Sequence, residues 1–376
     1  MVPVLYGDSM MKVSSPKSEE DLNRFAGFGV RVYEDVSNWV PPDTHHIVAN
    51  LSGRFPRAEQ SSHKAFWVLD DSGSILATVA AVISEPFNRH RGESLGHLAY
   101  FESLANHEEA GVAVLRAACD WLRERGCTAA RFGFLPSWQF PLTIDAYDAI
   151  PTFLHVVNPP SYHRIIKNAG FITERSLVEY RIAFTPELAA AYRGMIDKAE
   201  SAGATLRAWD FGQLEEETAQ FCQLTNDCFA RHWGIPQFSV DELAELTVGL
   251  RDSLVPGFMH FAEDRGQLAG FVYATPDLNQ AFHAMKGKDA AADDFPRYLK
   301  GINHGMLLII GVCEAFRGKG INLALAAKSY LAMMDRGYKS ASYTLVLDDN
   351  WPSRRTAEKL GGQVARNFAV YRREWK

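Results

Sequence analysis

The chain has 376 residues, of which 47% are hydrophobic and 22% are charged, a composition typical of a globular protein with room for two domains. The formal net charge of −6 argues against nucleic acid as the main partner. No apolar stretch reaches the length that a membrane span requires, so we expect no membrane partner.

The N-terminal segment and the cysteines indicate the cellular compartment. MVPVLYGDSMMKV (1–13) lacks a basic region followed by an apolar core, so we expect no signal peptide. The five cysteines form no CxxC pair and lack the spaced Cys/His partners of a structural zinc site. We therefore expect free thiols in a reducing cytoplasm and no bound metal. The cysteines are Cys119, Cys127, Cys222, Cys228 and Cys313.

Three segments predict the elements of the first half. In DDSGSILATVAAVI (70–83), a turn with glycine leads into a β-rich run, as in the second arm of a hairpin. The segment AACDWLRERGCTAARFGF (117–134) predicts a helix that ends near Gly126 and a strand after it. The half closes with KNAGFITERSLVEYRI (167–182), which predicts a helix end, a glycine and a strand.

The second half repeats this order. EDRGQLAGFVYATP (263–276) corresponds to the first turn and strand, and YLAMMDRGYKSASYTLVL (330–347) to the helix that ends in Arg-Gly. The final segment, EKLGGQVARNFAVYRR (358–373), aligns with 167–182 when Gly361 is placed on Gly170. This alignment also superposes Arg175 on Arg366, Tyr180 on Tyr371 and Arg181 on Arg372. Three matches in register favour a duplication over a helix-glycine-strand pattern that arose twice by chance.

The joint between the repeats is predicted in TPELAAAYRGMIDKAESAGATLRAWD (185–210). A helix begins near Pro186, and a new first strand covers about residues 205–208. We therefore predict one domain of residues 1–185 and a second of residues 186–376. The alternation of strands and helices favours an α/β fold with two similar domains, each a mixed sheet covered by helices. The sequence leaves open the oligomeric state and whether the last strand is exchanged between the halves or between subunits.

The segment EAFRGKGINLALAAK (314–328) places two glycines and two basic residues between a buried strand and a helix. MLLIIGVC (306–313), before it, is a continuous apolar run, and the apolar residues after it recur at helical spacing. A helix N-terminus suits an anion because its first N–H groups are unpaired. The loop departs from the Walker motif, since Gly320 follows Lys319, and from the GxGxxG motif, since Leu323 takes the place of the third glycine.

This loop resembles the pyrophosphate loop of the GNAT superfamily of acyl-coenzyme A transferases, whose pattern is Arg/Gln-x-x-Gly-x-Gly/Ala. Residues 317–322 match its first four positions, and Asn322 replaces the small last residue. YTLVLDDNWPSRRTAEKLGG (343–362) is similar to the strand and the asparagine-initiated helix that follow in that superfamily. VRVYEDVSNWVPP (30–42) and TPDLNQAF (275–282) resemble a bacterial group of tandem GNAT-like proteins, so the resemblance extends over nearly the full length.

The resemblance implies that the second half binds acetyl-coenzyme A or another acyl-coenzyme A as co-substrate, without a metal. The strand before the loop, in the stretch 311–313, would offer backbone groups to the pantetheine arm and one N–H to the developing oxyanion. Asn350 has a plain helix N-cap as its alternative role. The residues implied in coenzyme binding are Val312, Cys313, Arg317, Gly318, Lys319, Gly320 and Asn322 before and in the loop, and Asn350 and Ser353 at the next helix.

The acid that protonates the coenzyme thiolate departs from the family pattern. Many GNAT enzymes carry a tyrosine four residues before the glycine that ends the last helix. Ala357 stands at that position here, and Ile166 stands at the equivalent position of the first half. Water, Tyr343 or Tyr371 are the substitutes that the sequence offers.

The base and the acceptor site are predicted from position. Glu314, directly before the loop, is the candidate catalytic base, with a salt bridge to a basic residue of the loop as the alternative. Cys313 is either a nucleophile or a buried structural cysteine. Asp277 and Asn279 follow a strand and are the candidate substrate-binding residues, with turn formation as their alternative role.

The first half has no glycine-basic loop, and Glu108 and Glu109 at the corresponding helix start would repel phosphate. We therefore expect one working site, in the second half, that transfers an acyl group, most simply acetyl, to a small amine or an amino-acid-like acceptor. The alternative is a non-catalytic GNAT-fold protein that binds acyl-coenzyme A or another small ligand. A transferase that uses charged tRNA is disfavoured by the acidic composition.

Overall fold

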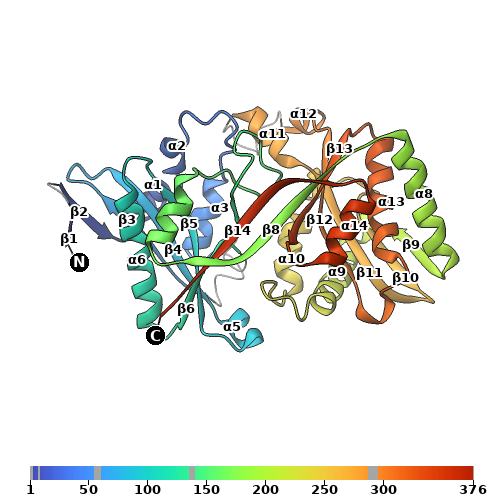
Figure 1. Ribbon diagram of the computed structural model, residues 1–376, viewed down its shortest axis with the longest axis horizontal. Helices are drawn as coiled ribbons and strands as arrows, with labels where there is room; N and C mark the ends of the chain where they lie inside the picture. Colours follow the sequence, from blue (N-terminus) through green and yellow to red (C-terminus); the bar gives the residue numbers. More distant parts are fainter. Residues whose placement is uncertain (1–2, 7–8, 55–60, 135–139, 287–294, 376) are drawn as a thin grey trace. The chain divides into compact units, whose positions relative to one another are not determined.

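The computed structural model describes residues 3–6, 9–54, 61–134, 140–286 and 295–375 (Figure 1). Their contacts group the chain into two compact units. Unit 1 comprises residues 1–151, 155–176 and 368–376, and unit 2 comprises residues 152–154 and 177–367. Each unit therefore contains a segment from the other half of the sequence, and the boundary at residue 185 stays a prediction of where the duplicated segments join.

Unit 1 contains a sheet and the helices around it. Its strands are β1 (Pro3–Tyr6), β2 (Ser9–Ser14), β3 (Ser61–Leu69), β4 (Ile75–Ser84), β5 (Leu95–Ser103), β6 (Ala129–Phe132), β7 (Leu142–Thr143), the start of β8 (Ile172–Ala183) and the end of β14 (Gln363–Glu374). Its helices are α1 (Glu19–Ala26), α2 (Gly29–Val32), α3 (Thr44–Leu51), α5 (Glu85–Arg91), α6 (Glu108–Glu124) and α7 (Ser161–Asn168).

Unit 2 contains the remaining parts of β8 and β14 and the other elements. Its strands are β9 (Ala204–Ala208), β10 (His260–Asp264), β11 (Gln267–Pro276), β12 (His304–Val312) and β13 (Ser340–Leu347). Its α-helices are α8 (Pro186–Ser201), α9 (Leu214–Cys228), α10 (Val240–Val248), α11 (Leu278–Met285), α12 (Phe295–Leu299), α13 (Ile321–Asp335) and α14 (Trp351–Lys359). Its 3-10 helices are η1 (Phe211–Gln213), η2 (Arg251–Ser253) and η3 (Glu314–Phe316).

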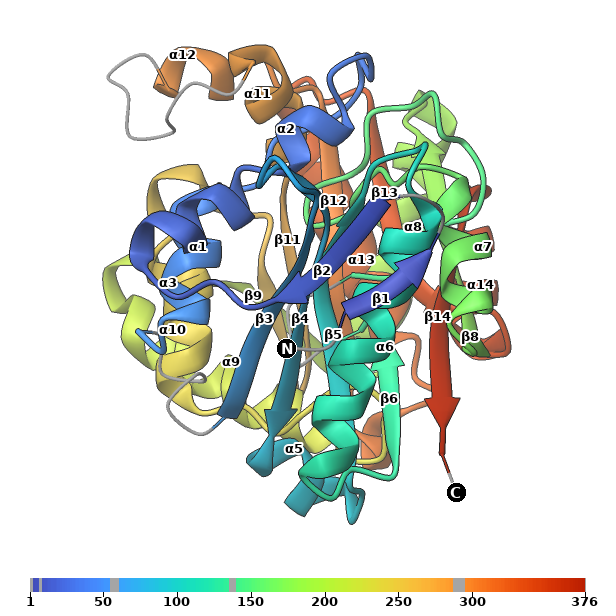
Figure 2. The same cartoon turned by 90° about the vertical axis from the view of Figure 1, so that its left-hand side faces the viewer.

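In unit 1 the strand order is β1-β2-β3-β4-β5-β6-β14. Neighbouring strands pair antiparallel, except β5 and β6, which are parallel. Helix α6 packs along this sheet (Figure 2), because Val114, Leu115, Ala118 and Leu122 recur at helical spacing and are fully buried. The pattern of apolar residues thus places one side of α6 on the sheet.

In unit 2 the strand order is β9-β10-β11-β12-β13-β8, and again one pair, β12 with β13, is parallel. Helices α8 and α13 lie side by side (Figure 1) and pack on one another. Helix α13 is buried against β10, β11 and β12 through Ala324, Leu325, Tyr330 and Met333. The predicted helix from Pro186 and the predicted strand near residues 205–208 are α8 and β9.

The two sheets repeat one another in register, which confirms the expected fold class of two similar mixed α/β domains. The N–H of Leu104, directly after β5, donates to the carbonyl of Leu76 at 3.1 Å. In unit 2 the N–H of Cys313, directly after β12, donates to the carbonyl of Ala269 at 2.9 Å. The two acceptors, Leu76 and Ala269, are residues that the alignment of 70–83 with 263–276 places in equivalent positions.

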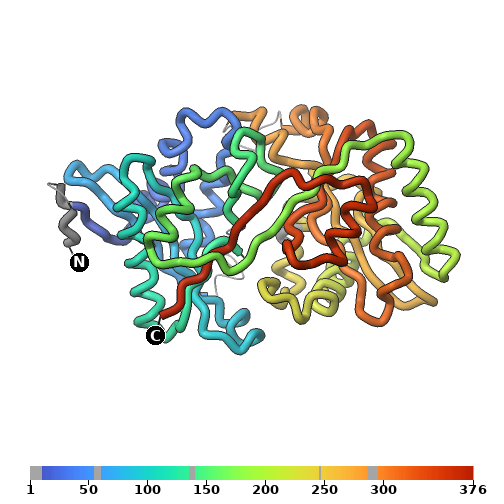
Figure 3. Tube along the Cα trace, viewed as in Figure 1, coloured from blue at the N-terminus to red at the C-terminus, as the bar shows by residue number. Residues whose placement is uncertain are grey.

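The last strand of the first half, β8, pairs into the sheet of unit 2, and the last strand of the second half, β14, pairs into the sheet of unit 1. Residues 177–183 of β8 pair with β13, with Tyr180 opposite Tyr343. Residues 371–374 of β14, in red in Figure 3, pair with β6, with Tyr371 opposite Phe132. Tyr180 and Tyr371 are therefore equivalent, as the sequence alignment predicts, and the exchange of the last strand takes place within one chain.

The close approach of β11 to β12 is open to a mutational test. A Cβ at Gly270 would lie 2.6 Å from the backbone oxygen of Gly311. We expect Gly270→Ala to lower the free energy of unfolding by about 1–3 kcal/mol, since the two strands would have to move apart. The control is Gly194→Ala on α8, where no atom lies within 4 Å and the change should stabilise by up to about 1 kcal/mol. Equal unfolding free energies for both variants, measured in urea, would contradict this packing.

Candidate functional site

The loop between η3 and α13 keeps a helix start open. Gly318 has φ +86° and Gly320 has φ +79°, backbone conformations that favour glycine. Apart from the glycine and its two chain neighbours, no heavy atom of the described residues lies within 4 Å of the place where a Cβ of either glycine would stand. Gly320 is the N-cap of α13, and the part of the chain that the structure describes offers no side-chain cap to this helix. Its first hydrogen bond joins Ala324 N to Gly320 O at 3.1 Å. The first-turn N–H groups thus have no partner within the helix, which suits an anion.

The two basic residues of the loop have different surroundings. Arg317 is exposed, and its Nε donates to the carbonyl of Val312 at 3.1 Å. Lys319 Nζ forms an ion pair with the buried carboxylate of Asp264 at the end of β10. The charge of Lys319 is therefore engaged within the protein, and Arg317 is the cation of this loop that faces solvent.

Strands β12 and β13 separate shortly before the loop. They pair from His304 opposite Ser340 to Leu307 opposite Tyr343, and no pairing between these two described strands extends further. Each strand has a bulge at this point. β12 has an extra residue opposite β11, at Leu308, and β13 has one opposite β8. Bulges bend a strand and increase its twist, so the two strands turn apart toward the loop.

One side of β12 therefore has backbone groups without a neighbouring strand, which we call the open side. Because Cys313 N donates to Ala269 in β11, and because successive residues of a strand alternate in direction, Ile310 and Val312 direct their N–H groups to the open side. Of the stretch expected to serve pantetheine, residues 311–313, this places the Val312 N–H on the open side and leaves the Cys313 N–H already paired.

Unit 1 fills the equivalent position with a side chain. Ser103 corresponds to Val312, and its N–H donates to Tyr162 Oη at 2.8 Å. Tyr162 Oη in turn donates to Glu102 Oε2 at 2.6 Å. In unit 2, among the described residues, no side chain is found bonded to the Val312 N–H. The two units thus share the arrangement of their strands and differ in whether a side chain bonds to the backbone of β5 or β12 at this position.

The start of α14 lies next to the start of α13 and to the point where the strands separate. Ser353 Oγ is 3.0 Å from Tyr343 Oη, and Asn322 Nδ2 donates to Thr356 Oγ1 at 2.8 Å. Asn350 Oδ1 accepts from Ser353 N at 3.3 Å, so Asn350 is an N-cap in this structure. The structure thus brings Asn322, Ser353 and Tyr343 together, and a role of the first two in coenzyme binding stays a prediction.

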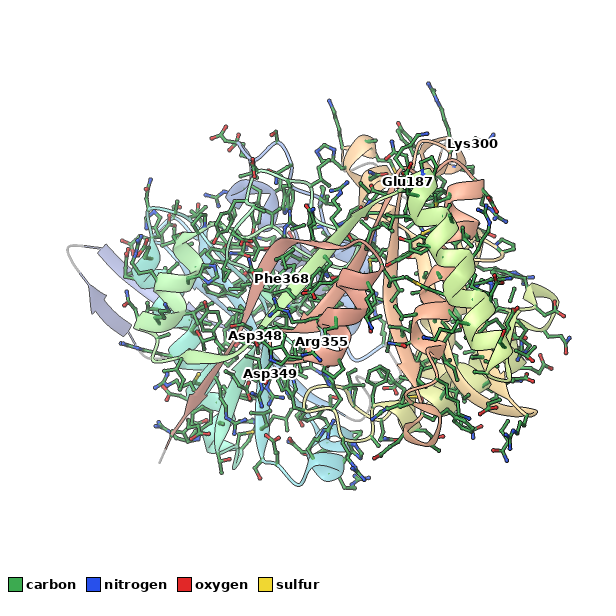
Figure 4. All side chains as sticks on the ribbon, turned by 45° about the vertical axis from the view of Figure 1, so that its right-hand side comes forward. Glu187, Lys300, Asp348, Asp349, Arg355 and Phe368 are labelled. Atoms are coloured by element: carbon green, nitrogen blue, oxygen red, sulfur yellow. The ribbon has the colours of Figure 1, made fainter. Side chains whose placement is uncertain are left out.

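The charges near α14 differ from those near α13. Asp348 and Asp349 lie in the turn before α14, and Arg355 follows within the helix (Figure 4). Carboxylates at a helix start stabilise the helix but repel a phosphate. The start of α13, with its glycines and Arg317, is therefore the better position for an anion.

The tyrosines that could serve as the acid lie in different units. Tyr343 is in unit 2, and burial raises its pKa to about 12, so the hydroxyl stays protonated at neutral pH. Tyr371 is in unit 1, where its hydroxyl lies 2.6 Å from His163 Nδ1. Ala357 is fully buried on α14. Tyr343 is thus the one of the two tyrosines that belongs to the unit with the loop.

Glu314 lies at the loop end of β12. Its side chain is 73% exposed and forms an ion pair with Arg231, with Nη1 3.9 Å from Oε2. The alternative of a salt bridge to Arg317 or Lys319 is thus replaced by an exposed pair with Arg231, which contributes little stability. The position leaves the carboxylate accessible, and its role as a base stays a prediction.

Asp277 and Asn279 lie at the other end of β12. Asp277 N donates to the carbonyl of His304 at 2.9 Å, so about 25 Å of strand separates this pair from the loop. Both side chains are buried and bind another segment of unit 2. Asp277 Oδ1 accepts from Phe153 N at 2.7 Å, and Asn279 Nδ2 donates to Thr152 O at 3.2 Å. The structure does not bring these two residues next to the loop, and acceptor binding by them stays a prediction.

Some of these partners could not be found from sequence. Asp264 and Thr356 engage two residues of the loop region, and residues 152–154 occupy the side chains expected to bind the acceptor. Each contact joins residues far apart in the chain, and neither spacing nor composition marks them.

The buried carboxyl of Asp277 gives a pH-dependent prediction. Burial raises its pKa to about 7, with Glu179 raising and Arg181 lowering it to smaller extents. Between about pH 4 and 7 the folded state then holds a proton that the unfolded state has lost, so raising the pH favours unfolding. Asp277→Asn keeps an oxygen acceptor and has no such proton.

We therefore expect Asp277→Asn to gain stability relative to the native chain as the pH rises from 4 to 7. Each unit of pKa shift corresponds to about 1.4 kcal/mol. The measurement is urea unfolding of both proteins at several pH values. Parallel stability curves for the two proteins would show that Asp277 is not held protonated by burial.

None of the described helices is long and apolar enough to cross a membrane. Within the same residues, no group of three or more His, Cys, Asp and Glu side chains is arranged to hold a metal ion.

Comparisons with known proteins identify the fold. Residues 218–362 match the acetyltransferase (GNAT) family. A bacterial ceramide synthase from Caulobacter vibrioides (strain NA1000 / CB15N) is 24% identical over 377 residues, which cover 96% of this chain and 97% of the relative. A tandem GNAT protein from the clavulanic acid biosynthesis pathway superposes with a TM-score of 0.56 at 11% identity, over 97% of this chain and 98% of that one.

A GCN5-related N-acetyltransferase from Sphaerobacter thermophilus superposes with a TM-score of 0.54 at 15% identity, over 97% of this chain and 95% of that one. At such identities the solved structures show the fold alone. The resemblance stated from sequence is confirmed: the chain has a tandem GNAT fold, and its second half carries the segment that matches the GNAT acetyltransferase family.

Proposed function

We propose that this protein is an acyl-coenzyme A-dependent N-acyltransferase with one working site, in the second half of the chain. The observation that carries the proposal is the combination of an open helix start at Gly320 with an open strand side at Ile310 and Val312. An acyl-coenzyme A has a pyrophosphate, which suits the open helix start, and an amide-containing arm, which suits the open side of the strand. The match of residues 218–362 to the GNAT family supports the same assignment.

The donor would be held from its phosphate end. Gly318 and Gly320 let the backbone approach the pyrophosphate, and Arg317 adds a positive charge. The backbone groups of Ile310 and Val312 would bind the pantetheine amides along the open side. Lys319 would support the loop through Asp264 rather than bind the phosphate directly.

The coenzyme supplies an activated thioester, and the protein must stabilise the charges that form when an amine attacks it. An N–H on the open side of β12 would stabilise the oxyanion. Tyr343, whose hydroxyl is protonated at neutral pH, would donate a proton to the departing thiolate. Glu314 would accept the proton of the amine.

The acceptor we favour is a small amine or an amino-acid-like amine, with acetyl as the simplest acyl group. A second candidate comes from the relative named bacterial ceramide synthase, which is aligned over 96% of this chain. A ceramide is an amide of a long-chain amino alcohol, so the acceptor would then be a long-chain amine and the donor a fatty acyl-coenzyme A. Both candidates form an amide from a thioester.

The test is the release of free thiol from acetyl- and palmitoyl-coenzyme A in the presence of an amino acid or a long-chain amino alcohol. Amine-dependent release with acetyl-coenzyme A and the amino acid supports the first acceptor class. Release that requires the palmitoyl donor and the long-chain amine supports the second. Binding of a donor without release under any pairing would contradict N-acyl transfer to these acceptors and favour the non-catalytic, ligand-binding alternative.

The proposed pyrophosphate site at the start of α13 predicts a specific loss of affinity. Gly320→Val should weaken acetyl-coenzyme A binding at least tenfold, about 1.4 kcal/mol, because a branched side chain would stand where the pyrophosphate approaches. Gly337→Val, at the other end of α13, is the control, since Gly337 also has positive φ and no atom within 4 Å. Calorimetric titration measures both variants. Equal affinities of the two variants for acetyl-coenzyme A would contradict pyrophosphate binding at the start of α13.

If Tyr343 is the acid, its hydroxyl is needed for turnover and not for coenzyme binding. Tyr343→Phe should lower kcat by about a hundredfold while the affinity for acetyl-coenzyme A is kept, since only the hydroxyl is removed. Tyr371→Phe, which removes a tyrosine hydroxyl from unit 1, should leave kcat within a few-fold of the native value. A Tyr343→Phe protein with native kcat would exclude this tyrosine as the acid.

The base predicts a change in the pH–rate profile. Glu314→Gln should lower kcat/KM and remove its rise on the acidic limb, because the amide accepts no proton there. Arg231→Ala removes the ion-pair partner but keeps the carboxylate, and should retain that limb. If the glutamine variant keeps both turnover and the limb, another group serves as the base.

A further inference from the structure

Two cysteines from distant parts of the chain meet next to the loop. Cys228 is the last residue of α9, and Cys313 directly follows β12. Their sulfur atoms are 3.3 Å apart. Both side chains are partly exposed, whereas Cys119, Cys127 and Cys222 are buried. A small oxidant can therefore reach this pair more readily than the other thiols.

The fold holds this pair together by a close approach of α9 to β12. A Cβ at Gly311 would lie 3.0 Å from Cys228 Cβ and 3.2 Å from its sulfur. The glycine thus leaves the space that the end of α9 occupies. Helix α9 packs on β11 and β12, and Cys228 and Cys313 lie at the border of a cluster that includes buried Phe221 and Phe271.

The surroundings make the two thiols chemically different. The pKa of Cys313 is lowered to about 7, chiefly by the hydrogen bond with Cys228 and to a smaller extent by the nearby Arg317, against the effects of burial and Asp227. The same hydrogen bond and burial raise the pKa of Cys228. Cys313 is therefore the more readily ionised thiol of the pair, which suits it to attack an oxidant while Cys228 acts as the resolving cysteine.

We propose that Cys228 and Cys313 form a reversible oxidation site for peroxides. The Cys313 thiolate attacks one peroxide oxygen, the O–O bond breaks, and Cys313 becomes a sulfenic acid while hydroxide leaves and takes up a proton. The Cys228 sulfur then attacks the Cys313 sulfur, its proton leaves, and the sulfenic oxygen departs as water. In total two thiols and one hydrogen peroxide give one disulfide and two waters.

The required movement is small. A disulfide has a sulfur–sulfur bond of about 2.05 Å, so the two sulfurs must approach by roughly 1.3 Å. The bond would tie the end of α9 to the residue that precedes η3 and the loop. The inference does not rest on the proposed function, because the chemistry involves only the two cysteines and the oxidant.

The experiment treats the reduced full-length protein with a slight excess of hydrogen peroxide and follows its thiols and mass. We expect the loss of two thiols and of the mass of two hydrogen atoms, a disulfide-linked peptide containing Cys228 and Cys313, and full recovery with dithiothreitol. Cys222→Ser, which changes a buried cysteine of the same helix, is the matched control and should behave like the native chain.

Two variants separate the roles of the cysteines. Cys228→Ser should stop at a sulfenic acid on Cys313, which a 1,3-diketone probe labels. Cys313→Ser should leave Cys228 unreacted at the same peroxide concentration. A disulfide that involves other cysteines, an unchanged thiol count, or equal peroxide reactivity of Cys228 and Cys313 in the single variants would overturn the proposal.

Discussion

The separation of β12 from β13 after Leu307 and Tyr343 is the constraint on which the rest of unit 2 depends. A strand inside a sheet has both rows of backbone groups paired, and β12 keeps only the row that faces β11 toward its end. The bulges in β12 and β13 produce this separation. Strand β12 stays paired with β11 throughout, and the close approach of Gly270 to Gly311 lies within this pairing. The loop then begins where the unpaired row ends.

The equivalent strand and helix of unit 1, β5 and α6, show how the same arrangement is completed where no glycine loop is present. Tyr162 bonds the Ser103 N–H on the equivalent strand side, and the helix that follows starts with Glu108 and Glu109. An unpaired backbone group is costly when buried, so it needs a partner such as a side chain, a water molecule or a ligand. Unit 1 uses a side chain, and we propose that a ligand takes this place in unit 2.

The sequence predicts those features that are local. The turns, helix ends, buried strand, glycine loop and equivalence of Tyr180 with Tyr371 follow from patterns a few residues long, and the structure contains them. The exchange of the last strand, the pairing of Lys319 with Asp264 and the meeting of Cys228 with Cys313 depend on tertiary packing. The same holds for residues 152–154, which bind Asp277 and Asn279 by backbone groups that every residue carries.

The central claim is that the open helix start and the open strand side together bind an acyl-coenzyme A. A thermal melt with coenzyme A, acetyl-coenzyme A and palmitoyl-coenzyme A tests it most directly. Ligand at a hundred times its dissociation constant stabilises the folded state by about 2.7 kcal/mol, which is readily seen as a rise in Tm. The account predicts a rise with all three compounds and a larger rise with the acyl group that the site accepts. No rise with any of them would contradict it.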